Sequence, residues 1–343
     1  MNRTEIILKE PATPPKRLWL ALGSFFFLAA SILATRGYLD SPGPTKPIPD
    51  AEIVSQTPEP RFAPTTKQGR PGNAIVVLVE PTADRKADLY PNAITNYLEA
   101  PSSTLSADPL DPALHVARLG LERLKLIQSY TAKITKRERI SGKLGASETL
   151  NAKIRRPMFT KGKATVPFSV YLKFAHPRSV AGREVLWVEG RENNKLLVRE
   201  AGFLGVIPIF LDPESKLAMS DSRYPIWEIG FDSLIEKMIE KGERDQKIGR
   251  STVEVNRWVE LDQRPCTEIV IAHPEFQEGF DFHRAEIVID DELNIPIHYA
   301  AYDFPETPGG MPRLLEQYTY REVDLDANLT EEDFQRSNPN YSF

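Results

Sequence analysis

The stretch that decides the fold is REVLWVEGRENNKLLVREAG, residues 183–202. Two apolar runs, at 185–188 and 196–198, flank a polar stretch at 190–194. Apolar runs separated by a short polar stretch with glycine are typical of a β-hairpin, here with a loop of about five residues. We therefore expect two antiparallel strands at this point, around which the rest of the chain is arranged.

The first strand of this hairpin is apolar on both sides. Successive side chains of a strand point to opposite faces, so Val185 and Trp187 share one face while Leu186 and Val188 share the other. A strand that is apolar on both faces needs cover on both faces. We expect one face to lie on a core helix, and the other to meet either a second layer or a hollow that holds an apolar guest.

The composition of the chain argues against some classes of function. The 343 residues carry a net charge of −5, whereas a nucleic-acid-binding protein would usually present a basic face. The sequence holds one cysteine, Cys266, so no intramolecular disulfide can form, and its strand-like surroundings indicate a small, buried side chain. The length allows roughly two domains, but the 29 prolines cluster early. We therefore expect a long, poorly ordered N-terminal region followed by one large domain.

The N-terminal region is expected to anchor the protein in a membrane. Residues 1–17 are polar and basic and form a predicted cytoplasmic tail, while residues 18–34 carry no charge and predict a transmembrane helix. The basic flank predicts a single-pass protein of the inner (cytoplasmic) membrane, with its C-terminal domain in the periplasm. A cleaved signal peptide is the alternative, because Ala29 and Ser31 fit a small-x-small cleavage site.

Residues 35–109 are irregular and rich in proline. Such a composition cannot bury enough apolar area to offset the entropy of the chain, so it predicts a largely disordered linker. The apolar run at 74–79 is the exception, and we interpret it as either an added edge strand or a sticky peptide. The folded domain is expected to occupy residues 110–343.

The predicted domain shows the periodicities of both helices and strands. Apolar residues recur at helical spacing over 111–128 and over 225–241. Alternating runs predict strands at 130–140, 150–154, 168–174, 185–188, 196–198, 252–261, 264–272, 283–289, 295–302 and 314–323. Short turns join these runs, which indicates an antiparallel meander with helices on one side. The expected fold is an α+β domain, a strongly curved antiparallel sheet or half-open barrel with helices packed on its concave side.

The sequence shows no recognised motif for catalysis or for metal binding, such as GxSxG, HExxH, a glycine-rich phosphate loop or Cys/His metal spacing. We therefore expect a non-enzymatic protein, with no catalytic residues, metal or cofactor. His176 and His273 each precede a proline at a strand end and are interpreted as edge positions. The acidic turn formed by Asp290, Asp291 and Glu292 is interpreted as a solvated hairpin tip.

Three stretches resemble an uncharacterised bacterial family that is frequent in planctomycetes, the domain of unknown function 1571. They are EVLWVEGRENNKLLVREAGFLG (184–205), LDPESKLAMSDSRYPIWEIGFDSLIEKMIE (211–240) and DELNIPIHYAAYDFP (291–305). The resemblance spans residues 113–343. The strand-rich pattern of that family is in turn distantly similar to periplasmic lipoprotein-carrier and lipoprotein-sorting proteins. It implies a curved, half-open antiparallel barrel that carries acyl chains in its hollow, and it assigns no acyl-contacting residue here.

The resulting hypothesis is a membrane-anchored, extracytoplasmic domain that binds an acyl chain or a lipidated protein in an apolar hollow. The predicted lining and lid of that hollow are Val185, Trp187, Phe203, Leu204, Ile207 and Phe210. One alternative is an envelope scaffold that binds protein or polysaccharide without a lipid ligand. Another is a sheet whose two faces are fully covered, with no guest. No nucleic-acid partner is expected, and the oligomeric state stays open.

Overall fold

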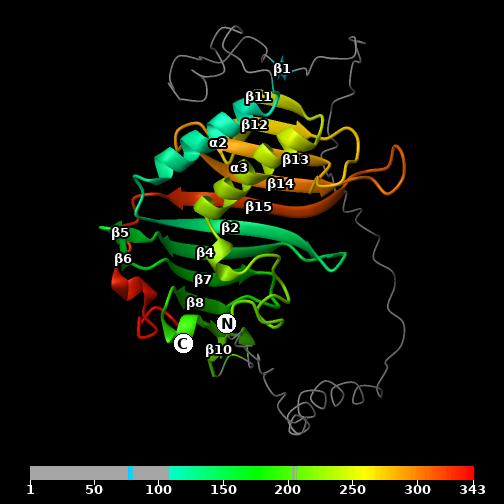
Figure 1. The fold of residues 1–343 in the computed structure, drawn as a ribbon. Helices are drawn as coiled ribbons and strands as arrows, with labels where there is room; N and C mark the ends of the chain where they lie inside the picture. The colour runs from blue at the N-terminus through cyan, green and yellow to red at the C-terminus, as the bar shows by residue number, and fades with distance from the viewer. Residues whose placement is uncertain (1–75, 80–107, 203–204, 206) are drawn as a thin grey trace, which may run out of the picture. The chain divides into compact units, whose positions relative to one another are not determined.

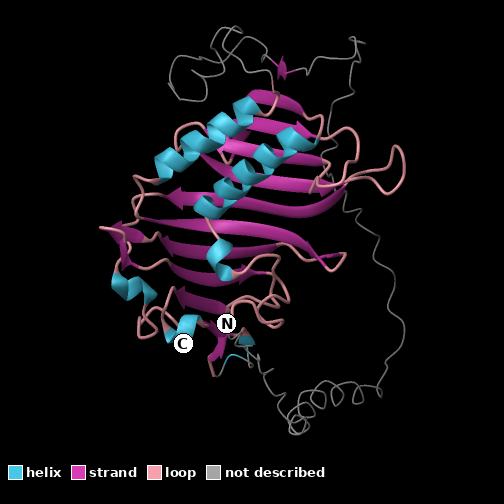
Figure 2. Ribbon diagram, in the orientation of Figure 1, coloured by secondary structure: helices cyan, strands magenta, loops and turns pink. Residues whose placement is uncertain are grey.

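The computed structural model describes residues 76–79, 108–202, 205 and 207–343. These residues form a large twisted sheet, with two helices lying across one face of it (Figures 1 and 2). The predicted cytoplasmic tail, the predicted transmembrane helix and most of the predicted linker lie outside the described residues. Within the part of the chain that is described, no helix has both the length and the apolar character needed to cross a membrane.

All ten strands predicted within the domain are present, whereas the short strands β3, β5, β6 and β10 were not predicted. The described strands are β1 (Val76–Val79), β2 (Ser129–Ile140), β3 (Lys143–Leu144), β4 (Glu148–Arg155), β5 (Met158–Thr160), β6 (Lys163–Val166), β7 (Ser169–His176), β8 (Glu184–Val188), β9 (Leu196–Arg199), β10 (Ile209–Leu211), β11 (Thr252–Leu261), β12 (Arg264–Ala272), β13 (Arg284–Asp290), β14 (Ile295–Asp303) and β15 (Arg313–Asp324). The helices are α2 (Asp111–Leu124) and α3 (Phe231–Ile248), with 3₁₀ turns η3 (Glu192–Asn194), η5 (Ile226–Glu228) and η6 (Glu331–Phe334).

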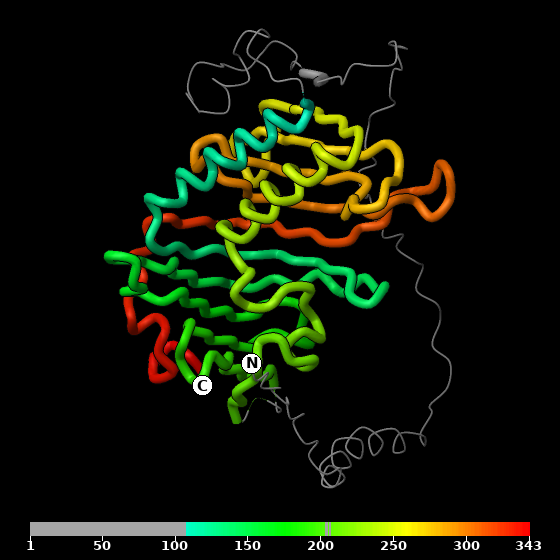
Figure 3. Tube along the Cα trace, in the orientation of Figure 1, coloured from blue at the N-terminus to red at the C-terminus, as the bar shows by residue number. Residues whose placement is uncertain are grey.

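Two antiparallel meanders make up the main sheet. One runs β2-β4-β7-β8-β9-β10 and the other β11-β12-β13-β14-β15, and they join where β15 pairs with β2 (Figure 3). Strand β1 extends the second meander by pairing parallel to β11, which confirms an edge strand within the apolar run at 74–79. In the described part of the chain the end strands β1 and β10 do not pair with each other. The domain is therefore an α+β fold with an open, mostly antiparallel sheet and not a closed barrel.

The helices exist as predicted, but their bounds differ. Helix α2 ends at Leu124, four residues before the predicted end. Helix α3 begins at Phe231 and not at 225, because Gly230 has φ 100° and ψ 179°, a conformation that cannot continue a helix. Residues 226–228 form the separate turn η5 instead. Helix α3 then continues to Ile248, seven residues beyond the predicted end.

The predicted hairpin is confirmed as the antiparallel pair β8–β9. Every residue of β8 is buried, so both of its faces are covered as its pattern requires. On the face that carries the helices, Trp187 packs in the main core, with its ring centroid 5.7 Å from that of Phe168 and 6.2 Å from that of Trp227. The opposite face of the same strand is covered by the C-terminal segment of the chain.

His273 is buried, so its interpretation as an edge position is wrong. Its Nδ1 lies 3.2 Å from Ser251 Oγ and its Nε2 lies 3.1 Å from Asp245 Oδ2. The imidazole also stacks on the ring of Phe280, with centroids 3.8 Å apart. These three residue types occur in hydrolase triads, but here all three side chains are buried. The cluster ties the C-terminal end of α3 to the neighbouring ends of β11 and β12.

The acidic turn after β13 is not a solvated tip. Asp290 is fully buried, and it accepts hydrogen bonds from the Arg264 guanidinium and from the backbone N–H groups of Glu292 and Leu293 at 2.9 Å each. Asp291 is also buried, and its carboxylate accepts a hydrogen bond from Thr267 Oγ1 at 2.9 Å. The acidic residues therefore organise the β13–β14 turn from within.

His298 on β14 makes the stability of the fold sensitive to acid. Its Nδ1 lies 2.8 Å from Thr319 Oγ1, and burial together with the nearby Arg321 lowers its pKa from 6.5 to about 4. The unfolded chain therefore binds this proton at a higher pH than the folded chain does, so this contribution to stability is complete above pH 6.5 and falls as the pH is lowered towards 4. When the pH is lowered from 7 to 5, we expect the free energy of unfolding to fall by about 2 kcal/mol less in a His298→Gln variant than in the wild type, as measured by urea unfolding. Equal losses in the two proteins would contradict this assignment.

Candidate functional site

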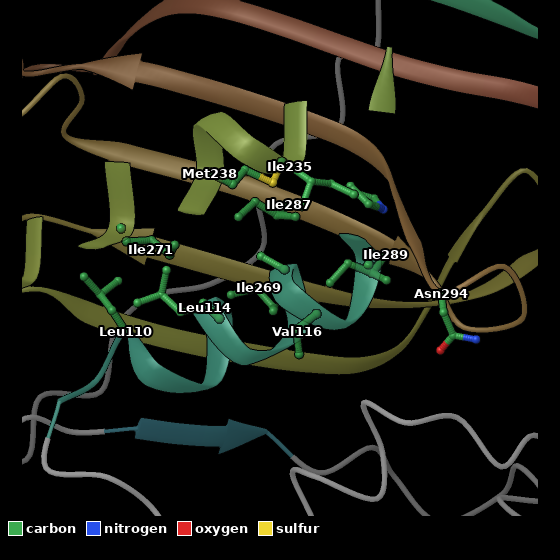
Figure 4. Close-up of a pocket in the computed structure, with 15 residues that line it drawn as sticks. Leu110, Leu114, Val116, Ile235, Met238, Ile269, Ile271, Ile287, Ile289 and Asn294 are labelled. Carbon is green, nitrogen blue, oxygen red and sulfur yellow. The ribbon is translucent and has the colours of Figure 1, made fainter. Parts of the chain in front are cut away.

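The first candidate site is an apolar hollow between the two helices and the second meander (Figure 4). Its lining, which defines the helix–sheet hollow, comprises Leu110, Ala113, Leu114, Val116, Ala117, Gly120, Ile235, Met238, Gly242, Ile269, Ile271, Ile287, Ile289, Asn294 and Pro296. Its volume is about 40 Å³, whereas a cavity of about 150 Å³ is known to accommodate benzene. A hydrocarbon tail therefore does not fit in this conformation.

Two glycines keep the helix–sheet hollow small. A Cβ atom at Gly242 of α3 would lie 2.8 Å from Leu114 Cδ2, and one at Gly120 of α2 would lie 3.1 Å from Ile235 Cδ1. Leu114 of α2 thus packs against Gly242 of α3, and Ile235 of α3 packs against Gly120 of α2. This close approach fills most of the space above the sheet, so the hollow is mainly packed core.

The second candidate site lies on the opposite face of the sheet, at the predicted hairpin. Four apolar side chains meet there in register across β7, β8, β9 and β10. Tyr171 lies opposite Leu186, Leu186 lies opposite Leu197, and Leu197 lies opposite Phe210. Directly opposed residues of antiparallel strands present their side chains on the same face. The sheet therefore carries a continuous apolar row that runs to its free edge.

The C-terminal segment covers one end of this apolar row. The Tyr341 ring stacks on Tyr171, with centroids 3.8 Å apart and an interplanar angle of 11°. Asp333 pairs with Lys153 at 2.7 Å, and the Ser342 backbone N–H donates to Glu184 Oε2 at 2.8 Å. These contacts fix the segment over β4, β7 and β8. This face of the hairpin therefore has a second layer over one part of the row.

The other part of the row is the floor of an open groove of about 480 Å³. The residues that define this hairpin groove are Leu186, Val188, Arg191, Glu192, Lys195, Leu197, Phe210, Phe334, Gln335, Arg336, Ser337 and Phe343. Small-molecule sites usually have volumes of about 300 to 1,000 Å³ and mostly apolar walls. The hairpin groove has such a volume, an apolar floor and a polar rim.

The loop that forms one side of the groove has a strained backbone. Glu192, Asn193 and Asn194 all have positive φ angles, of 49°, 55° and 62°. A left-handed conformation costs a residue other than glycine about 1 kcal/mol. Local hydrogen bonds offset this strain, since Trp187 Nε1 donates to the Asn194 carbonyl oxygen and the Gly190 N–H to Asn194 Oδ1, both at 3.2 Å. Strain of this kind is frequent at binding sites.

The rim of the groove is more cationic than anionic. Arg191 forms an ion pair with Glu331, a carboxylate that Arg155 also contacts at 3.0 Å. Lys195 and Arg336 are exposed, and in the described part of the chain neither has a carboxylate partner. Glu192 is the acidic residue of the lining. An anionic group at the mouth of the groove would therefore meet two unneutralised cations.

The predicted lining residues are distributed over several places. Val185 and Trp187 are buried in the main core on the helix-bearing face, and not in the hairpin groove. Phe210 lines the groove, whereas Ile207 is exposed and is not part of the lining. Phe203 and Leu204 lie outside the described residues.

Leu186, Val188 and Leu197 of the groove floor were not among the predicted site residues. The signal that could have found them is the alternation within β8, which places Leu186 and Val188 on the face opposite Trp187. The other wall, around Phe334 and Arg336, depends on the chain folding back from its C-terminal region, which strand periodicity does not reveal. Among the described residues, no group of three or more His, Cys, Asp or Glu side chains is placed to hold a metal ion.

A family model described as "Protein of unknown function (DUF1571)" matches residues 127–343. The match covers more than half of the chain, so this protein belongs to that family, and the resemblance seen in the sequence is confirmed. No curated protein matches the chain.

Several solved structures are remotely similar to the chain. A DUF1329 family protein from Desulfovibrio piger is 12% identical with a TM-score of 0.32, over 67% of this chain and 98% of that one. A putative outer membrane lipoprotein-sorting protein domain from Vibrio parahaemolyticus is 11% identical with a TM-score of 0.29, over 65% and 95%. The lipoprotein LppX from Mycobacterium tuberculosis is 14% identical with a TM-score of 0.34, over 64% and 100%. The predicted distant similarity to lipoprotein-sorting proteins thus recurs among these structures.

Proposed function

We propose that this protein is an extracytoplasmic lipid-binding domain that holds an acyl chain, of a lipid or of a lipidated protein, in the hairpin groove. The observation that supports this proposal is an open groove of about 480 Å³ whose floor is the apolar row of the hairpin. In this proposal residues 18–34 anchor the chain in the inner membrane, and the open sheet serves as a half-open barrel of the lipoprotein-carrier kind.

The apolar floor supplies enough free energy for such a ligand. Transfer of a methylene group from water to an apolar site contributes about 0.8 kcal/mol. A chain of ten buried methylenes would therefore gain about 8 kcal/mol, which corresponds to a dissociation constant near the micromolar range before the entropic cost of association is subtracted. Binding of this kind needs no catalytic residue.

The groove is a better candidate than the helix–sheet hollow for a simple steric reason. The hollow has a volume of about 40 Å³, so a tail could enter it only if α2 and α3 moved away from the sheet. Moving the two helices apart from each other would in addition separate the Gly242–Leu114 and Gly120–Ile235 contacts, which join α2 to α3. The groove needs no such rearrangement.

The test is photolabelling of the full-length protein in intact cells with a diazirine-bearing fatty acid, followed by mass-spectrometric mapping of the adducts. We expect adducts on β8 to β10 and on the C-terminal segment, near Leu197, Phe210 and Phe334. A Phe210→Glu variant should reduce them about tenfold, because a carboxylate placed in an apolar site disfavours the tail. Phe210 is partly exposed, so the fold should tolerate the change.

The matched control is Leu126→Glu, which adds the same charge at an exposed position after α2. It should leave the labelling pattern unchanged. Adducts confined to α2, α3 and β12–β14 would overturn the groove as the site and indicate an opened helix–sheet hollow. The absence of specific adducts would overturn lipid binding and favour the envelope scaffold.

A further inference from the structure

The apolar row of the hairpin continues beyond the end of the hairpin groove. Leu186 lines the groove, whereas Tyr171, which lies opposite it on β7, is not part of the lining. Tyr171 is only 4% exposed, because the C-terminal segment packs over it. The groove and the covered part of the row therefore share one apolar floor, and side chains of the C-terminal segment separate the two.

Two aromatic side chains of the C-terminal segment form this separation. Phe343 lines the groove, and its ring centroid lies 6.4 Å from that of Tyr171 and 6.2 Å from that of Tyr341. Both pairs are edge-to-face, while Tyr341 itself stacks on Tyr171. Edge-to-face and stacked arrangements are the favourable ones for aromatic rings. We name Tyr341 and Phe343 the end wall of the groove.

Polar contacts hold the end wall in place. Ser342, between the two rings, donates its backbone N–H to the carboxylate of Glu184, which is 1% exposed. The Tyr341 hydroxyl donates to the Asp333 carbonyl oxygen at 2.6 Å, and the Lys153 ammonium group lies 5.4 Å from the centroid of the Tyr341 ring. The end wall is therefore fixed by contacts to β4, β8 and η6.

The opposite end of the row is open. Phe210 lies on β10, the end strand of the main sheet, and is 41% exposed. The head group of a fatty acid is charged, and burial of a charge without a partner is strongly unfavourable. A tail therefore enters from the open end with its terminal methyl group first. That direction of entry brings the methyl group up against the end wall.

We propose that the end wall sets the length of the acyl chain that the hairpin groove accepts. This inference rests on the proposed function of the groove. The floor runs from Phe210 on β10 to Leu186 on β8, two strand spacings or about 10 Å. Each methylene that fits between them strengthens binding about fourfold. Methylenes that would extend beyond the end wall stay in water and add nothing.

The test is photolabelling of the full-length protein in intact cells with fatty acids of increasing length that carry the diazirine at the terminal carbon. In the wild type, the mapped adducts should move from Phe210 to Leu186 and Phe343 as the chain lengthens, and Tyr171 should stay unlabelled. In a Tyr341→Ala/Phe343→Ala variant, the longer chains should label Tyr171. Competition with unlabelled fatty acids should show the fourfold gain per methylene continuing to longer chains than in the wild type.

The matched control is Phe276→Ala, because Phe276 is 70% exposed in the loop between β12 and β13. It should leave the adduct positions unchanged. Phe343→Ala alone keeps the stack of Tyr341 on Tyr171, so it should extend the accepted length by less than the double variant does. Labelling of Tyr171 in the wild type, or unchanged adduct positions in both variants, would overturn the end wall and leave acyl binding in the groove standing. If no chain gave specific adducts in the groove, the proposed function would fall, and the end wall with it.

Discussion

A Gly230→Ala variant is expected to lose about 4 kcal/mol of unfolding free energy. Gly230 precedes α3 with φ 100°, a conformation that strains any residue with a side chain. The added Cβ would also overlap the hydroxyl oxygen of Tyr130 and lie 3.3 Å from Ile154 Cδ1. That hydroxyl accepts a hydrogen bond from the Phe231 N–H at 3.0 Å, so the clash would disturb the first turn of the helix.

A double-mutant cycle separates strain from overlap at Gly230. Urea unfolding of Gly230→Ala, Tyr130→Phe and the double variant should give non-additive losses, because Phe at position 130 removes the overlapping oxygen. Gly182→Ala is the matched control, since Gly182 has φ 90° but no atom within 4 Å of the added Cβ. It should cost about 1 kcal/mol, from strain alone. Additive losses, or equal losses at 182 and 230, would contradict the steric assignment.

An Arg264→Ala variant is expected to lose about 3 kcal/mol of unfolding free energy. Asp290 has no exposed surface and accepts hydrogen bonds from the Arg264 guanidinium, so removal of the arginine leaves a buried carboxylate without its counter-ion. Breaking a buried pair in this way costs about 3 to 5 kcal/mol. We expect the lower end of this range, because the Arg264 side chain is itself 38% exposed and water can reach the site.

The comparison for Arg264 is an arginine of similar exposure whose partners are in solvent. Arg313 pairs with Asp303 and Glu306, both of which are partly or largely exposed, so Arg313→Ala should cost less than about 1 kcal/mol. Combining Arg264→Ala with Asp290→Asn should recover part of the loss by removing the charge. Equal costs for the two arginines in urea unfolding would show that the burial of Asp290 does not decide the effect.

Local patterns in the sequence were sufficient to predict the ten longer strands of the domain, but not the short strands β3, β5, β6 and β10 or the pairing of β15 with β2. Alternation at 185–188 and 196–198 predicted the β8–β9 hairpin, because a strand's side-chain period of two does not depend on distant residues. The start of α3 was predicted wrongly because its apolar stripe extends back through Trp227, although the backbone at Gly230 interrupts the helix. Amphipathic spacing reports which face is buried and not where the hydrogen-bonded turns begin.

The misplaced residues all depend on partners that are distant in the sequence. His273 is buried because Asp245 and Ser251 satisfy its ring nitrogens, and Asp290 is buried because Arg264 neutralises it. Polar residues such as these are usually exposed unless they are paired, so a sequence without known partners suggests the wrong environment. The hairpin groove was missed for the same reason, since its second wall comes from the C-terminal segment.

The pairing of β15 with β2 has a consequence for how the chain is made. The Tyr318 hydroxyl on β15 donates to the Glu138 carboxylate on β2, and these residues are 180 positions apart. During synthesis, β2 therefore keeps one unpaired edge until β15, about 180 residues further along the chain, has emerged. Such long-range closure is slow, and waiting edges are prone to aggregate. A nascent chain halted before Arg313 would lack β15, so the edges of β2 and β14 that pair with it would stay unpaired. We expect chaperones or proteases to bind such a chain.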